Sequence, residues 1–165
     1  MIALKTIFAQ IENSMSEKDF IPSSYITLKE EGIIGYTSPS NIALVKYWGK
    51  RENQIPANPS ISFTLAACIT KTSVEYKKKI RKDDEFSFDL FFEDQPKEEF
   101  KPKIKTFLKR IEKYLPFLKE YHLVIKTSNT FPHSSGIASS ASGMSALALC
   151  FMEMERTFSA SITDD

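Results

Sequence analysis

Residues 129–144 combine the residue types that a phosphate-binding turn requires. They read NTFPHSSGIASSASGM, and their small side chains would let the backbone approach an anion closely. A strand is expected before this segment and a helix after it, so backbone N–H groups and the positive end of a helix dipole would converge there. The candidate phosphate-binding residues are Gly136, Ala138, Ser139, Ser140, Ala141 and Gly143. A serine-capped helix that packs closely through small residues is the structural alternative.

The same segment lacks the hallmarks of two common catalytic motifs. No Gly-Lys-Ser/Thr follows the glycine, so the segment is not a Walker-type phosphate loop. No Gly-x-Ser-x-Gly elbow surrounds Ser139 or Ser140, so a serine hydrolase is not indicated. His133 has no acidic partner evident in the sequence, and we interpret it as a spectator rather than as a catalytic base.

A second segment, residues 38–51, gathers cations beside aromatic rings. It reads SPSNIALVKYWGKR and contains the only tryptophan of the chain. Lysine binds phosphate as a point charge, and tyrosine adds one directed hydroxyl group, so the cluster fits a diphosphate or a carboxylate ligand. A surface loop around a buried tryptophan fits the same residues equally well. The candidate ligand-binding residues are Asn41, Lys46, Tyr47, Trp48, Lys50 and Arg51.

A third segment, residues 56–62, carries small polar groups just before an expected strand. Its polar side chains are those of Asn58, Ser60 and Ser62. Such residues are typical of turns and strand edges, and we interpret them as structural rather than functional.

The overall composition is that of a globular domain without a bulk charge. The chain has 165 residues, of which 42% are hydrophobic and 26% are charged, and this is enough for one domain with a core. Lysine and arginine number 22 against 21 aspartates and glutamates, which gives a net charge of +1. This balance argues against binding of nucleic acid through bulk charge, but it allows a local anion site.

The cysteines and the apolar runs indicate a cellular compartment. Cys68 and Cys150 lie far apart in the sequence, which favours two buried, reduced thiols over a disulfide. Neither has a cysteine or histidine at metal-ligand spacing, so we expect no zinc site. The apolar runs are far shorter than a membrane span, and the N-terminus has no signal-peptide pattern. We therefore expect a cytoplasmic protein that does not associate with a membrane.

The strands that would position these segments follow from the sequence pattern. Strands are expected over residues 32–37, 61–67, 73–80, 85–93 and 123–126. Pro39 would end the first strand, because proline cannot donate to a sheet. The charged residues 81–84 would form a solvated hairpin turn between the third and fourth strands.

Two helices are expected, over residues 100–115 and 139–158. The first has apolar residues at helical spacing and would end at Pro116, and the second has an unusually small-sided first half. The order of strands, helix, strand and helix indicates an α+β or mixed α/β fold. Residues 1–31 form an N-terminal extension that we assign to structural packing. Its apolar stripe would consist of Ile2, Leu4, Ile7, Phe8 and Ile11.

Together the three segments resemble the diphosphomevalonate decarboxylase family of the GHMP kinase superfamily. The motifs Ser-Pro-Ser-Asn-Ile-Ala, Lys-Tyr-Trp-Gly-Lys-Arg, Asn-Pro-Ser-Ile-Ser and Ser-Gly-Ile-Ala-Ser-Ser-Ala-Ser-Gly occur in the family's order and at similar spacing. Tyr-Trp-Gly-Lys is close to diagnostic, because the sugar and mevalonate kinases of the superfamily lack it. Ala138 also matches the decarboxylases, since the kinases usually have glycine there.

The resemblance covers about residues 34–158 and implies the α+β fold of the GHMP-kinase N-terminal domain. This fold is a mixed or antiparallel sheet packed on helices, here over residues 32–165. The implied reaction is the ATP-dependent decarboxylation of (R)-5-diphosphomevalonate to isopentenyl diphosphate, with ATP and Mg²⁺ as cofactors. ATP phosphorylates the tertiary 3-hydroxyl group, and phosphate leaves as CO₂ is lost. The partners would be these small molecules and a second copy in a homodimer.

The resemblance also implies roles for individual residues. The side chains of Tyr47 and Lys50 would meet the substrate diphosphate, and Asn41 would help to hold the substrate carboxylate. Trp48 and Gly49 belong to the same substrate segment, and so does Lys46, whose role is less defined. Residues 136–143 would form the ATP phosphate-binding loop, in which Ser140 matches the family's catalytically important serine and Ser139 lies beside it. One basic residue at the start of the first long helix would touch the diphosphate, and the candidates are Lys101, Lys103 and Lys105.

The sequence departs from the family in three respects, of which the mildest is Ser134-Ser135 where many members have Thr-Ala-Ala. Pro59 stands where the family often has serine and offers no N–H group. The family's later Gly-Ser-Gly-Ser…Arg segment and its catalytic aspartate are absent from these 165 residues, so we expect the chain alone to be inactive. Another GHMP kinase, such as a mevalonate or phosphomevalonate kinase or a monophosphate decarboxylase, and a non-catalytic binding fragment are the alternatives.

Overall fold

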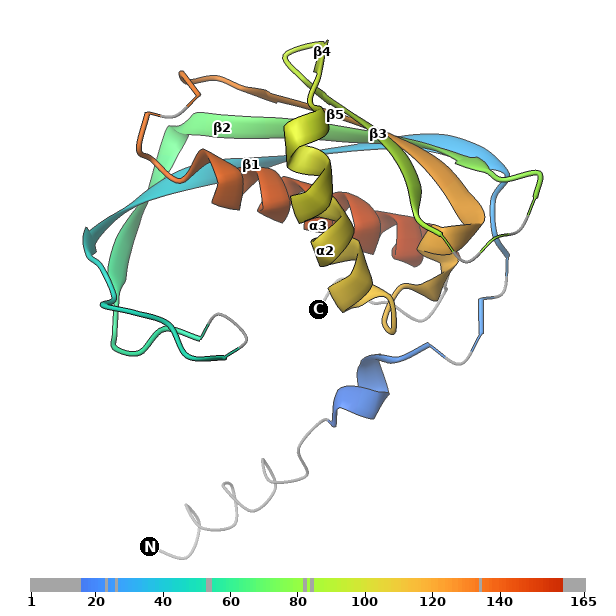
Figure 1. Ribbon diagram of the computed structural model, residues 1–165, viewed down its shortest axis with the longest axis horizontal. Helices are drawn as coiled ribbons and strands as arrows, with labels where there is room; N and C mark the ends of the chain where they lie inside the picture. The colour runs from blue at the N-terminus through green and yellow to red at the C-terminus, as the bar shows by residue number, and fades with distance from the viewer. Residues whose placement is uncertain are drawn as a thin grey trace, which may run out of the picture.

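A five-stranded mixed sheet forms the framework of the protein (Figure 1). The computed structural model describes residues 16–158 apart from 23, 26, 53, 54, 82, 84 and 134, so the expected apolar stripe near the N-terminus lies outside the described residues. The strand order is β1-β2-β5-β3-β4; β3 and β5 run parallel and the other neighbours antiparallel. The α+β fold is thereby confirmed. The strands are β1 (Glu31–Val45), β2 (Ile61–Lys78), β3 (Ser87–Phe92), β4 (Gln95–Pro96) and β5 (Tyr121–Asn129).

Two helices cover one face of this sheet (Figure 1). Helix α2 (Lys101–Ile111) buries Ile104 and Leu108, and helix α3 (Ser139–Phe158) has the predicted bounds. Both helices pack against alternate apolar residues of the central strands, such as Val74 and Ile125. Short 3₁₀ segments are η1 (Glu17–Phe20), η3 (Glu98–Phe100) and η4 (Pro116–Glu120).

Helix α2 ends at Ile111, earlier than the expected residue 115. The N–H groups of Tyr114 and Leu115 both bond to the Ile111 carbonyl, at 2.9 and 3.0 Å, which closes a turn. This turn buries the Leu115 side chain in the core, which a continued helix would carry elsewhere.

Strand β1 does not end at Pro39, so that expectation is wrong. It continues to Val45, and its register with β2 shifts between Pro39 and Ser40. An irregular pairing at this point tolerates the missing N–H group of proline, and β1 is an edge strand. The two strands expected over 61–67 and 73–80 are likewise one continuous strand, β2.

The expected hairpin at residues 81–84 is also wrong. Strands β2 and β3, which flank it in the sequence, are not neighbours, because β5 lies between them. Leu123 and Ile125 of β5 are each 1% exposed. Strand β5 lies at the centre of the sheet, and it pairs in parallel with β3 after a crossover through α2.

The described part of the N-terminal extension packs against the domain, as expected. Tyr25 and Leu28 lie against the core, and the Tyr25 ring meets Phe117 edge-on at 5.1 Å between centroids. The Tyr121 hydroxyl donates to the Lys29 carbonyl at 2.6 Å. Tyr25, Leu28 and Lys29 thus fix the entry into β1.

Both cysteines are free thiols. Cys150 is buried, as expected, and its Sγ donates to the Thr72 carbonyl at 3.5 Å. Cys68 is only half-buried.

Within residues 16–158, as far as they are described, no helix is long and apolar enough to span a membrane.

Candidate active site

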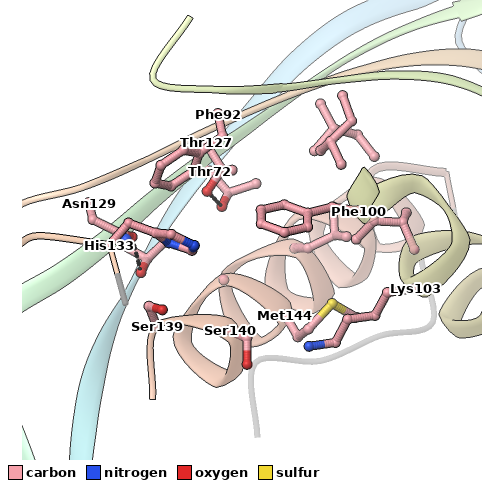
Figure 2. Close-up of a pocket in the computed structure, with 16 residues that line it drawn as sticks. Thr72, Phe92, Phe100, Lys103, Thr127, Asn129, His133, Ser139, Ser140 and Met144 are labelled. Carbon is pink, nitrogen blue, oxygen red and sulfur yellow. Dashed lines mark hydrogen bonds between the residues drawn. The ribbon is translucent and has the colours of Figure 1, made fainter. Parts of the chain in front are cut away.

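A cavity of about 160 Å³ lies between the sheet and the first turns of α2 and α3 (Figure 2). Its walls are largely apolar. The rings of Phe92, Phe100 and His133 line it, with the His133 ring 5.0 Å from Phe92 and 5.8 Å from Phe100 between centroids. Its polar edge consists of Thr70, Thr72, Thr127, Asn129, Ser139, Ser140 and Lys103.

The turn before α3 contains two residues in left-handed backbone conformation. Gly136 has a φ of +79° and Ala138 a φ of +60°, so the chain reverses through left-handed conformations before the helix begins. The Ala138 carbonyl accepts the N–H groups of Ala141 and Ser142 at 2.9 and 3.2 Å. Helix α3 begins at Ser139. The first N–H groups of a helix have no carbonyl partner within the helix, so the N-terminal end of α3, where Ser139 and Ser140 lie, carries a partial positive charge.

A hydroxyl network fixes this first turn of α3 to the sheet. Ser142 Oγ lies 2.6 Å from Thr70 Oγ1, and Thr70 donates to Asn129 Oδ1 at 2.8 Å. Ser142 is 3% exposed and Thr70 1%, so these bonds are shielded from water. The sequence pattern indicates Ser142 only as a small side chain and does not single out Thr70. The available signal is the pair of polar residues, Thr70 and Thr72, on the inward face of β2 beside Val74 and Tyr76.

Strand β1 also holds the turn before α3. The hydroxyl group of Ser40, which is 1% exposed, donates to the Ile137 carbonyl. Ser40 belongs to the second sequence segment and Ile137 to the first. The tertiary structure therefore places residues 38–51 and residues 129–144, which are far apart in the sequence, in direct contact.

The cations of the second segment lie in a turn beyond the end of β1. Gly49 has a φ of +97°, and its carbonyl accepts the Ala57 N–H at 3.1 Å. The Lys50 ammonium lies 5.7 Å from the centre of the Tyr47 ring, in cation–π geometry. Trp48 is 89% exposed, so the interpretation as a loop around a buried tryptophan is wrong.

The structure brings only some of the candidate residues to the cavity. The cavity is lined by four of them, Ser139, Ser140, Gly143 and Lys103. Asn41 lies elsewhere, on the β1–β2 arm, which consists of residues 40–45 of β1 and their partners 61–65 of β2. There, Asn41 Nδ2 donates to Ser62 Oγ at 3.3 Å. The residues of the 46–50 turn are not among those that line the cavity. Figure 1 shows this turn curling beneath the end of the sheet at which α3 begins.

The three candidate lysines of α2 differ in their surroundings. Lys101 pairs with Glu98 at 2.8 Å and Asp89 at 3.5 Å, and the hydrogen bond to Glu98 raises the pKa of Lys101. Lys105 pairs with Glu85 at 3.3 Å. Lys103 lines the cavity, and Figure 2 shows it reaching past Met144 towards the side on which Ser140 lies. Lys103 is thus the one of the three lysines that lies at the cavity.

Comparison with known proteins gives a consistent result. The family model for the diphosphomevalonate decarboxylase-like N-terminal domain matches residues 38–162. The diphosphomevalonate decarboxylase of Debaryomyces hansenii is 34% identical over 128 residues, which cover 72% of this chain and 33% of that protein. This chain therefore spans about a third of the length of that relative.

Solved structures agree with the sequence comparison. The mevalonate diphosphate decarboxylase of Staphylococcus aureus is similar with a TM-score of 0.63 and 27% identity, over 77% of this chain and 37% of that chain. MDDEF, solved in complex with MVAPP, AMPPCP and magnesium, is similar with a TM-score of 0.59 and 28% identity, over 80% of this chain and 39% of that chain.

Proposed function

Because this chain belongs to the diphosphomevalonate decarboxylase family, we propose that it provides the ATP-phosphate and diphosphate sites for the decarboxylation of (R)-5-diphosphomevalonate to isopentenyl diphosphate. The observation that carries the proposal is the left-handed turn at Gly136 and Ala138, followed by the start of α3 beside the cavity. The complex of MDDEF with MVAPP, AMPPCP and magnesium supports ATP and Mg²⁺ as the cofactors.

The residues present fit a nucleotide phosphate. Left-handed backbone, helical N–H groups and two serine hydroxyl groups meet at the start of α3, and an anion is favoured at this end of a helix. In this proposal Ser139 and Ser140 bind ATP phosphate oxygens and Lys103 adds a positive charge. Mg²⁺ is usually held by phosphates and few protein oxygens, so one serine hydroxyl group is a sufficient protein ligand. Bound ATP would supply the phosphoryl group that makes the tertiary hydroxyl group a good leaving group.

Substrate binding is assigned to the β1–β2 arm. Tyr47 and Lys50 would bind the diphosphate, with Lys46, Trp48 and Gly49 in the same segment, and Asn41 would orient the carboxylate that is lost as CO₂. Such binding keeps the reacting groups aligned while charge develops, which is the main contribution of a protein to chemistry of this kind.

Calorimetric titration with ATP–Mg²⁺ tests the nucleotide site. The 165-residue chain is expected to release or absorb heat on binding, and Ser140→Ala is expected to weaken binding about tenfold, as loss of a hydrogen bond to a charged group does. Ser145→Ala, an exposed serine further along α3, is the matched control and should bind like the unchanged chain. Absence of heat with both ATP–Mg²⁺ and diphosphomevalonate would favour a non-catalytic fragment.

An assay of CO₂ release separates binding from turnover. No aspartate or glutamate is among the described residues that line the cavity, so the group that would orient the 3-hydroxyl group is not supplied there. We expect the chain to bind its ligands without releasing CO₂ from diphosphomevalonate. Robust formation of isopentenyl diphosphate would contradict this, and ADP formation without CO₂ would indicate a kinase instead.

A further inference from the structure

The turn that follows β1 is closed by the side chain of Asn58. Asn58 Oδ1 accepts the Trp48 N–H at 2.6 Å, and Asn58 Nδ2 donates to the Pro59 carbonyl at 3.0 Å. One carboxamide thus connects the first part of the turn to the chain that enters β2.

Burial does not hold this turn in place. Trp48 is 89% exposed, Ile55 56% and Tyr47 37%, so these side chains make little contact with the core. The turn therefore depends on polar contacts across it. Besides the Asn58 bonds, these include Ala57 N–H to the Gly49 carbonyl at 3.1 Å and Arg51 N–H to the Ile55 carbonyl at 2.8 Å.

The position of the Trp48 N–H determines where the adjacent groups point. The peptide unit between Tyr47 and Trp48 is planar, so a bond that fixes this N–H group also fixes the Tyr47 carbonyl and restrains Tyr47 itself. The Tyr47 ring lies 5.7 Å from the Lys50 ammonium. Asn58 thereby acts on the hydroxyl group and the cation that the proposed function assigns to the diphosphate.

We propose that Asn58 is a positioning residue, which holds the 47–50 turn ready for a diphosphate group through its bond to the Trp48 N–H. This inference rests on the proposed function, because it takes the diphosphate role of Tyr47 and Lys50 from there. Preorganisation is the physical benefit: a turn that is already ordered loses less conformational entropy when the anion binds.

Amide hydrogen exchange of Trp48, followed by NMR in the 165-residue chain, tests the hydrogen bond without any ligand. Asn58→Ala is expected to accelerate exchange of this amide about tenfold or more. Asn58→Asp keeps the acceptor oxygen and should leave the amide protected. Asn41→Ala removes a carboxamide from the same arm that bonds to Ser62, and it is the control for a general loosening. Unchanged exchange in Asn58→Ala would overturn the inference.

Titration with inorganic pyrophosphate, followed by fluorescence of the single tryptophan, tests the consequence for binding. The unchanged chain is expected to bind, and Asn58→Ala to bind about tenfold more weakly. Equal affinity of both chains would overturn the positioning role while the proposed diphosphate site stands. No binding by the unchanged chain would overturn the proposed diphosphate site itself, and this inference with it.

Discussion

At the scale of single residues, the surroundings of a group decide what it does. Ser139 and Ser140 are exposed enough to meet a ligand, whereas Ser142, on the same first turn of the helix, is buried and structural. Glu155 and Cys150 are buried on the same helix, where burial changes their titration. Residue type alone does not separate these roles, because the same hydroxyl group or carboxyl group occurs in both settings.

Glu155 is expected to make stability depend on pH. Tyr25 donates to its Oε1 at 3.3 Å. Burial raises the pKa of Glu155 above the ordinary 4.5, although the bond from Tyr25 lowers it. Because the pKa of Glu155 is raised in the folded state, this side chain contributes fully to the free energy of unfolding below pH 4.5. The contribution is lost as the pH rises through the pKa that Glu155 has in the folded state.

Glu155→Gln should therefore raise the free energy of unfolding at neutral pH by about 1 kcal/mol and flatten its decline above about pH 4.5. Urea unfolding at a series of pH values measures both effects. A variant that is less stable than the unchanged chain at neutral pH would show that the ionised carboxylate is favourable there.

The two thiols are expected to react at very different rates. Burial raises the pKa of Cys150 to about 11, and the residue is 0% exposed. Thiolate is the reactive form of cysteine, so Cys150 should resist a maleimide at neutral pH until the chain unfolds, whereas the half-buried Cys68 should react first. Mass spectrometry after timed labelling measures this. In Cys68→Ala, fast labelling of the folded chain would contradict the expectation.

At the scale of elements, the site depends on how α3 is attached to the sheet. Its first turn is fixed by Ser142 and Thr70 to β2 and by Asn129 to β5, and its preceding turn is held by Ser40 of β1. Three strands thus position one helix end. This arrangement keeps the backbone N–H groups at the start of α3 in place.

Thr70→Val is expected to weaken this attachment. Valine has the same shape but no hydroxyl group, so Asn129 Oδ1 and Ser142 Oγ lose a buried partner. The expected loss in the free energy of unfolding is about 1–3 kcal/mol. Thermal or urea unfolding measures it, and Thr70→Ser, which keeps the hydroxyl group, should lose clearly less. Equal losses in both variants would point to packing of the threonine methyl group instead.

At the scale of the whole molecule, the β1–β2 arm extends beyond the helices that cover the rest of the sheet. Ile42 pairs with Phe63 and Val45 with Ile61, and all four side chains are between 38% and 59% exposed. Ile42 and Phe63 lie two residues beyond the pair of Ser40 and Leu65. Side chains two residues apart on a strand share a face, so Ile42 and Phe63 lie on the face from which Ser40 contacts the turn before α3. In the described part of the chain, this face carries an exposed apolar patch.

The apolar patch is expected to bind a hydrophobic fluorescent dye. The double variant Ile42→Thr with Phe63→Thr should bind less dye while its free energy of unfolding changes by no more than about 1 kcal/mol, because both residues are exposed. Ile80→Thr, which removes an isolated exposed side chain, is the control and should leave dye binding unchanged. Undiminished fluorescence in the double variant would place dye binding elsewhere.

The sequence by itself determined the presence of helices α2 and α3, the α+β class and a glycine-containing turn before α3. Helical periodicity and turn chemistry are local, so the spacing from Ile104 to Ile111 and the small residues around Gly136 suffice to predict them. The resemblance to the family, carried by short motifs, is confirmed by the match over residues 38–162. The roles of the individual site residues remain proposals.

Only the tertiary structure decided which strands pair and which polar groups meet. The central place of β5, the passage of β1 through Pro39 and the bonds of Thr70 all involve partners distant in the sequence. Which strands pair depends on which apolar faces the whole chain buries together. A hydroxyl group or a carboxamide bonds to whichever partner folding brings within about 3 Å. Local pattern contains neither piece of information, and therefore Trp48 was as consistent with burial as with the exposure that the fold gives it.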